Sequence, residues 1–228
     1  MLILLATILP SAILVLYFVK SDKFKEPSFQ IIKIFFLGIL ITIPAFFLNT
    51  YLDNFFLNNT NISKALIESF LTAAPVEEGL KFLILFYFVY KMKDFNEPID
   101  GIVYGVCVSL GFATLENIYY VYVLPDFFKT TSLSLALTRA FSAVPAHAAF
   151  GAFMGYFFTK YSFISKKDNL FFSIIIPIFL HGFYNLSMHY NYIVGYILVI
   201  IMWIIIYKIF SRLKKTQSSK KFEYEKKL

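Results

Sequence analysis

Two adjacent glutamates and a lysine stand in the middle of an otherwise apolar stretch. In APVEEGLK (residues 74–81), Glu77 and Glu78 are followed by Lys81. In a helix, the spacings i,i+4 and i,i+3 bring Lys81 close to both carboxylates. Lys81 can offset part of the cost of burying one negative charge, but two neighbouring carboxylates in a low dielectric do not both ionise easily. One of them is therefore a candidate general acid or base, and Pro75 just before them predicts a kink in the helix.

A third glutamate lies deep within the apolar segment 99–124. Glu116, followed by Asn117, has no lysine or arginine close to it in the sequence. We therefore expect its partner to come from another helix, a metal or water. Arg139, in the segment 132–159, can balance a glutamate. The competing interpretation is that this arginine extends toward the outer membrane surface.

Two histidines lie on two further apolar segments. His147 shares one helix face with Gly151 and Gly155, so a neighbouring helix can pack closely beside it. His181 and Asn185 are i,i+4 neighbours. A lone histidine in a membrane helix is often a hydrogen-bonded packing residue, whereas two histidines at similar depth favour a shared functional site.

These residues lie in segments that are long and apolar enough to span a bilayer, which requires about 20 residues each. The sequence predicts an all-α membrane protein, a polytopic bundle of about seven transmembrane helices. We expect a single domain over residues 1–210 and a charged, disordered cytoplasmic tail over 211–228. The seven expected helices cover about residues 2–19, 30–48, 65–90, 99–124, 132–159, 170–188 and 192–210.

Composition and charge agree with a membrane protein. Apolar residues make up 59% of the 228, and the mean hydropathy is +0.70, which is too high for a soluble domain of this size. The net charge of +7 gathers in alternate connectors and in the tail. The positive-inside rule then places the C-terminus in the cytoplasm and the N-terminus outside. No basic stripe with interleaved aromatics occurs, so we expect the lipid bilayer, and no nucleic acid, as a partner.

The polar residues share a similar depth. At 1.5 Å per residue, Glu77 and His147 lie roughly 20 Å from the cytoplasmic ends of their helices, Glu116 about 25 Å and His181 about 16 Å. A charge at this depth costs roughly 2.5–3.5 kcal/mol on insertion scales. Packing alone explains such a gathering poorly, so the sequence predicts a water-filled acid–base site or a divalent-metal site.

Four motifs in this order resemble the PrsW family of bacterial intramembrane proteases and, more distantly, the CAAX prenyl endopeptidase (Abi) superfamily. They lie within residues 65–188, whereas the first helix, the 49–63 connector and the tail carry none. The motifs are APVEEGLK (74–81), DGIVYG with GFATLENIYY (100–105 and 111–120), PAHAAFGAFMG (145–155) and HGFYN (181–185).

The resemblance implies a multi-pass endopeptidase of the bacterial cell (inner) membrane. Such an enzyme hydrolyses a peptide bond in or beside a membrane-spanning protein substrate, such as an anti-sigma factor. Carried over position by position, the implied catalytic residues are Glu77, Glu78, Glu116, His147 and His181, with Lys81, Asn117, Arg139 and Asn185 in supporting positions.

Two mechanisms fit these residues. In a metal-free site, Glu77 or Glu78 activates a water, and the histidines stabilise the oxyanion or donate a proton. In a metal site, a zinc ion is bound by residues drawn from Glu78, Glu116, His147 and His181. The chain lacks an HExxH pair, which favours the version that requires no cofactor.

Two other functions compete with proteolysis. Membrane glutamates, lysines and histidines also form proton relays in ion-coupled transporters, although this chain is short and lacks an inverted repeat. A non-catalytic Abi-like immunity or scaffold protein is the second alternative. Aspartyl chemistry is disfavoured because all six aspartates fall in connectors or at helix ends.

Overall fold

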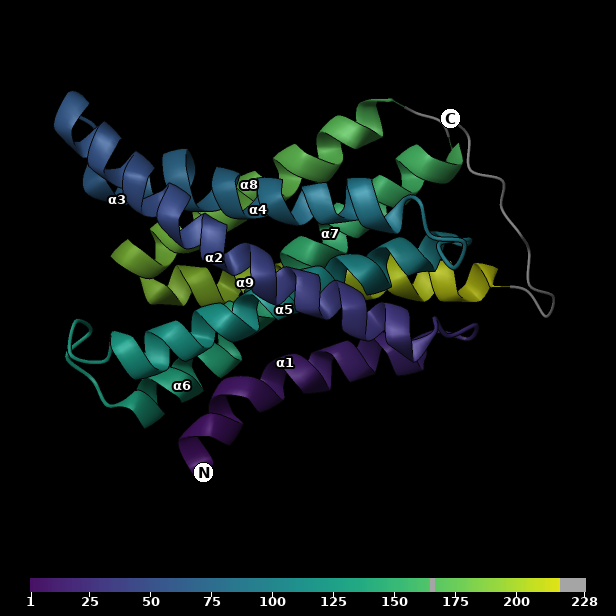
Figure 1. The fold of residues 1–228 in the computed structure, drawn as a ribbon, viewed down its shortest axis with the longest axis horizontal. Coiled ribbons are helices and arrows are strands. Elements are labelled where there is room, and N and C mark those ends of the chain that lie inside the picture. Colours follow the sequence, from purple (N-terminus) through teal and green to yellow (C-terminus); the bar gives the residue numbers. More distant parts are fainter. Residues whose placement is uncertain (165–166, 218–228) are drawn as a thin grey trace.

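The computed structural model describes residues 1–164 and 167–217, and within these ranges it contains helices and no strand. The predicted all-α class is therefore confirmed. Most of the helices run between two opposite ends of an elongated bundle (Figure 1). The α-helices are α1 (Leu2–Ser21), α2 (Ser28–Asn59), α3 (Lys64–Leu66), α4 (Ala74–Ile84), α5 (Pro98–Val123), α6 (Ser132–Phe141), α7 (Ala143–Ile164), α8 (Asp168–Tyr190) and α9 (Tyr192–Thr216), and two π-helical segments are η1 (Ile67–Ala73) and η2 (Leu85–Val89).

Five helices in the described ranges, α1, α2, α5, α8 and α9, are long and apolar enough to cross a membrane. The helical run over 64–89 is divided into four pieces, and neither it nor α7 is among these five. The π-helical segment η1 ends two residues before Pro75. Proline lacks an N–H group and crowds the carbonyl four residues earlier, so the irregular backbone occurs where the sequence predicts a kink.

The predicted helix over 132–159 is wrong as a single element. It breaks at Ser142, where φ is −122° and ψ is −72°, so that α6 ends at Phe141 and α7 begins at Ala143. Pro145 explains the break, because its ring would clash with the carbonyl of Phe141 in a continuous helix. The break places Arg139 on α6 and the motif PAHAAFGAFMG (145–155) on α7.

Two predicted helix ends are also wrong. The second helix continues to Asn59, through residues expected to form a connector. The last helix continues to Thr216, so residues 211–216 are helical and do not belong to a disordered tail. The prediction of disorder for residues 218–228 lies outside the described residues.

The centre of the bundle is α5, which packs against α7 through glycines. A Cβ atom on Gly105 would meet the carbonyl oxygen of Gly151, and one on Gly155 would meet that of Gly101. The two backbones therefore touch, as the glycine spacing predicts. This contact fixes the relative position of the two helices that carry Glu116 and His147.

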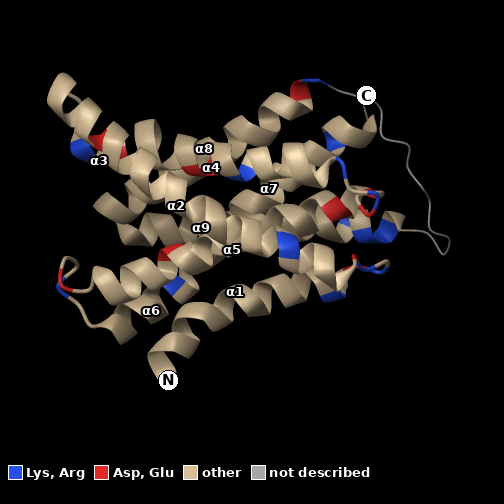
Figure 2. Ribbon diagram, viewed as in Figure 1, with Lys and Arg blue, Asp and Glu red and all other residues tan. Residues whose placement is uncertain are grey.

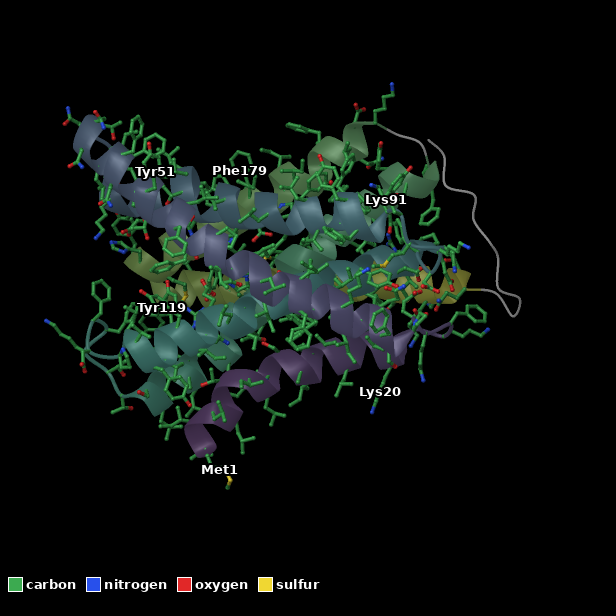
Figure 3. The ribbon with its side chains drawn as sticks, in the orientation of Figure 1. Met1, Lys20, Tyr51, Lys91, Tyr119 and Phe179 are labelled. Atoms are coloured by element: carbon green, nitrogen blue, oxygen red, sulfur yellow. The ribbon has the colours of Figure 1, made fainter. Side chains whose placement is uncertain are left out.

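The two ends of the bundle differ in charge. The α1–α2 connector, the connector before α5 and the last turn of α9 lie at one end, and the α2–α3 and α5–α6 connectors at the other (Figure 1). Lysine and arginine gather at the first end (Figure 2). Lys20 and Lys91 lie toward that end, whereas Tyr51 and Tyr119 lie toward the opposite one (Figure 3).

The basic end also holds buried acidic side chains. Gln217 Nε2 donates to Asp22 Oδ1 at 2.7 Å and so ties the end of α9 to the α1–α2 connector. In the same connector, Glu26 accepts a hydrogen bond from Tyr104 Oη at 2.7 Å. Burial raises the pKa of Glu26 to about 7, and the nearby carboxylate of Asp22 acts in the same direction.

Candidate active site

Four helices bring the predicted catalytic residues into one connected network. The paired glutamates and Lys81 come from α4, Glu116 from α5, His147 from α7 and His181 from α8. Glu116 is partly buried and the others are buried. The sequence placed these side chains at one depth, and the structure adds that they contact one another across the helices.

Lys81 occupies the middle of this network. Its Nζ donates to Glu78 Oε1 at 2.7 Å and to His147 Nδ1 at 3.1 Å, and it lies 4.0 Å from Glu77 Oε2. The ammonium also lies 4.4 Å from the centre of the Phe112 ring, a cation–π arrangement. The positive charge of Lys81 therefore offsets part of the negative charge of both Glu77 and Glu78.

Each histidine of the network has a carboxylate partner. Lysine can only donate, so the contact with Lys81 leaves Nδ1 of His147 as an acceptor and places the ring hydrogen on Nε2. That nitrogen donates to Glu116 Oε2 at 3.0 Å. Nδ1 of His181 lies 2.8 Å from Glu78 Oε1. Carboxylates that orient histidines in this way occur in both metal sites and general-base sites.

Arg139 is the cross-helix partner that the sequence requires for Glu116. Its Nη2 donates to Glu116 Oε2 and its Nε to Asn117 Oδ1, both at 2.6 Å. The guanidinium lies 3.9 Å from the centre of the Tyr120 ring. The interpretation that Arg139 extends toward the outer membrane surface is wrong, because its side chain is only 11% exposed and is held by these three residues.

Glu77 lies farther from the charged and histidine side chains of the site than Glu78 and Glu116 do. Its Oε2 is buried and accepts no hydrogen bond within the described part of the chain, and it lies 4.0 Å from both Lys81 Nζ and His181 Nε2. Donor atoms of Glu77, His147 and His181 lie within 4.8 Å of one another. Glu78 Oε2 is also buried without a hydrogen-bond partner among the described residues, but Glu78 already contacts Lys81 and His181 closely through Oε1. Glu77 has no such close contact to the lysine or the histidines, so its Oε2 is free to approach a further ligand or water.

These three residues fit a divalent metal in type and number. Catalytic zinc sites commonly have three protein ligands, including the combination of two histidines and a glutamate. A common zinc ion would need one donor atom from each of the three side chains at about 2.0–2.2 Å. Glu78 and Glu116 would then serve as the hydrogen-bonding partners of the two histidines.

Two residues lie elsewhere than the sequence suggests. Asn185, one turn after His181 on α8, is partly buried and makes no side-chain hydrogen bond within residues 1–164 and 167–217. Asn49, which sequence reasoning missed, donates from Nδ2 to Glu77 Oε1 at 3.3 Å. Asn49 was missed because the second helix was expected to end at residue 48. Extending that helix by a few residues would have placed Asn49 on a membrane helix, where a polar side chain needs a partner.

Comparison with known proteins identifies the family. A family model described as "PrsW family intramembrane metalloprotease" matches residues 26–209. A protein named Protease PrsW from Geobacillus kaustophilus (strain HTA426) is 34% identical, over 90% of this chain and 89% of its own length. The Protease PrsW of Clostridioides difficile (strain 630) is 35% identical, over 90% and 87%. That of Bacillus subtilis (strain 168) is 36% identical, over 80% and 81%. No solved structure matches the chain.

The fold defines a helical membrane protein that buries a network of carboxylate, histidine and lysine side chains. The chain belongs to the PrsW family, and it is an intramembrane protease. The family match covers all four motifs that carry the site. This membership favours a peptidase over the ion-coupled transporter and over the non-catalytic immunity or scaffold protein.

Proposed function

We propose that this protease hydrolyses peptide bonds in or beside a membrane-spanning protein substrate, such as an anti-sigma factor, and that Glu77 is central to its chemistry. The observation that carries the proposal is the buried, unpartnered Oε2 of Glu77, 4.0 Å from both His181 Nε2 and Lys81 Nζ. A water or a metal-bound ligand placed there would contact the carboxylate and the histidine together.

In the version that requires no cofactor, Glu77 is the general base. It takes a proton from a water whose oxygen forms a bond to the scissile carbonyl carbon. Lys81 supplies an N–H donor for the developing oxyanion, and His181 lies close enough to orient the attacking water. The proton on Glu77 then passes to the amide nitrogen, the C–N bond breaks, and an acid and an amine leave. Glu78 holds His181 in orientation, and Glu116 with Arg139 and Asn117 holds His147.

In the metal version, Glu77, His147 and His181 are the protein ligands. The sequence suggested Glu78 and Glu116 as the carboxylate ligands beside the two histidines. We propose Glu77 in their place, because Glu78 and Glu116 already accept hydrogen bonds from Lys81 and Arg139. A divalent ion such as zinc, if held there, would polarise the carbonyl as a Lewis acid and make a bound water more acidic. Glu78 is then the remaining carboxylate available as a base, and its Oε2 is buried with no hydrogen-bond partner among the described residues.

We further infer seven crossings of the bacterial inner membrane, with the N-terminus outside and the C-terminus in the cytoplasm. The run over 64–89 and the α6–α7 pair both connect the two ends of the bundle (Figure 1), which supports two crossings beyond the five apolar ones. Lysine and arginine gather at the end where α9 finishes (Figure 2), which supports the orientation.

The test is cleavage of fluorescently labelled single-span peptides by the purified protein in liposomes. We expect Glu77→Gln to lower the rate by about 100–10,000-fold, the usual contribution of general acid–base catalysis. Glu78→Gln and His181→Ala should also lose activity while remaining folded. Loss on chelation and recovery with zinc would establish the metal version, whereas insensitivity to chelation would establish the other. Cleavage that survives in all three variants would overturn the site assignment.

A further inference from the structure

We propose that Asn49 is a positioning residue for Glu77. Its amide holds one oxygen of the carboxylate, so that the other faces His181 and Lys81. The inference rests on the proposed role of Glu77, and it holds whether Glu77 acts as a base or as a metal ligand. It brings α2, which carries none of the family motifs, into the active site.

The two oxygens of Glu77 have different surroundings. Oε1 accepts from Asn49 Nδ2 at 3.3 Å, and no other hydrogen bond to Glu77 occurs within the described residues. Oε2 lies 4.0 Å from His181 Nε2 and from Lys81 Nζ. A carboxylate held through one oxygen keeps the other in a defined direction, which lowers the cost of reaching the reactive geometry.

A second contact keeps α2 beside the segment that precedes Glu77. Thr72 Oγ1, in η1, donates to Asp53 Oδ1 at 2.7 Å. Asn49 and Asp53 are four residues apart and therefore lie on one face of α2. The first contact reaches the catalytic carboxylate and the second does not, so the chain contains its own control for the packing of α2.

Packing alone does not explain an asparagine at this position. Asn49 Oδ1 is buried and accepts no hydrogen bond from any described residue. An unsatisfied amide oxygen is costly, and an apolar side chain would avoid that cost. The donor group of the amide is the part that is used, and it is used by Glu77.

The experiment measures kcat and KM for cleavage of a labelled single-span peptide in liposomes. It compares wild type, Glu77→Gln, Asn49→Ala, Asn49→Gln and Thr72→Val. We expect Asn49→Ala to lower kcat by about 10–100-fold, the usual effect of removing a hydrogen bond that orients a ligand or catalytic side chain, with KM little changed. Asn49→Gln keeps the amide and should recover part of the loss. Thr72→Val removes the second α2 contact, together with the hydroxyl's contacts to the carbonyls of Ile67 and Glu68 in its own helical run, and should keep the wild-type kcat.

A second readout requires no turnover. The infrared band of the Glu77 carboxyl group, isolated as the difference between wild type and Glu77→Gln, should shift in Asn49→Ala and not in Thr72→Val. An unshifted band, or a wild-type kcat in Asn49→Ala while Glu77→Gln is inactive, would overturn the positioning role and leave the proposed function intact. Equal losses in Asn49→Ala and Thr72→Val would also overturn it, because both would then report the packing of α2. Wild-type cleavage by Glu77→Gln would overturn both proposals.

Discussion

At the scale of single residues, the site is organised around one buried cation. Lys81 contacts Glu78, His147 and the Phe112 ring, and it is close to Glu77. A buried charge without a partner is far more costly than a buried pair. The lysine therefore stabilises the fold and sets the electrostatic environment of the carboxylates that we propose to be catalytic.

Replacing Lys81 should show this dual role. We expect Lys81→Met to lower the free energy of unfolding by about 3–5 kcal/mol, because it leaves Glu78 buried without a counter-charge. Activity should be lost as well. Adding Glu78→Gln to the same protein should restore part of the stability but not the activity. Chemical unfolding in detergent and peptide cleavage measure the two effects.

The matched control is an exposed lysine on the same helical run. Lys64 pairs with Glu68 at 3.4 Å, with side chains 62% and 42% exposed. Lys64→Met should change the free energy of unfolding by less than about 1 kcal/mol, as for other surface pairs. Similar losses in the two variants would contradict a special role for the buried ammonium.

At the scale of helices, the contact between α5 and α7 positions the site. Both helices are almost wholly buried where they meet, and their glycines bring the two backbones together. Ser109 on α5 also donates to the carbonyl of His147 at 2.6 Å. The separation of Glu116 and His147 therefore depends on the absence of side chains at the crossing.

A single methyl group should disturb this crossing. Gly105→Ala places a Cβ against the carbonyl oxygen of Gly151, and neither backbone can move without shifting its helix. We expect a loss of about 1–3 kcal/mol in stability from overpacking, together with lower activity. Gly79→Ala is the control, because no atom beyond the neighbouring backbone of its own helix lies within 4 Å of its added Cβ. Alanine there should be neutral or slightly stabilising through its helix propensity. Thermal unfolding in detergent tests both.

At the scale of the whole molecule, the charged connectors predict an orientation that labelling can test. Cys107 is the only cysteine of the chain and is buried, so background labelling should be low. We expect an impermeant maleimide to label Asn61→Cys and Phe127→Cys in intact cells. Lys93→Cys and Lys167→Cys should react only after lysis. Asn61 and Lys93 flank the helical run over 64–89, and Phe127 and Lys167 flank α6 and α7. The reverse labelling pattern would contradict the orientation. Equal labelling of the two members of a pair would contradict the membrane crossing between them.

The acidic connector predicts a pH dependence of stability. The pKa of Glu26 is raised by burial from 4.5 to about 7, with Asp22, Asp94 and Asp100 as its acidic neighbours and Tyr104 as a hydrogen-bond donor. Between these two pH values the folded state keeps a proton that the unfolded chain has lost. The free energy of unfolding should therefore fall as pH rises through that window.

Thermal unfolding in detergent checks this dependence. Each kcal/mol lost should lower the Tm by about 2–4 °C for a chain of this size. Glu26→Gln cannot ionise, so its Tm should fall less over the same pH range. If the Tm of wild type and of Glu26→Gln changed identically with pH, Glu26 would not contribute to the pH dependence of stability.

The helical class, most of the buried network and the family resemblance could all be read from the residues. Apolar length and the spacing of glutamates, histidines and glycines are local properties of a chain, so Glu77, Glu78, Glu116, His147 and His181 could be selected without a structure. The break at Ser142 had a local signal in Pro145, but the length and composition of the segment outweighed it.

The pairings within the site needed the three-dimensional arrangement. Arg139 on α6 reaches Glu116 on α5, Lys81 on α4 contacts His147 on α7, and Asn49 reaches Glu77 from a helix that is longer than expected. Each contact joins residues that are distant along the chain, and each depends on how whole helices cross. Residue types and their periodicity specify which side chains need partners in a membrane, whereas helix packing selects the partners.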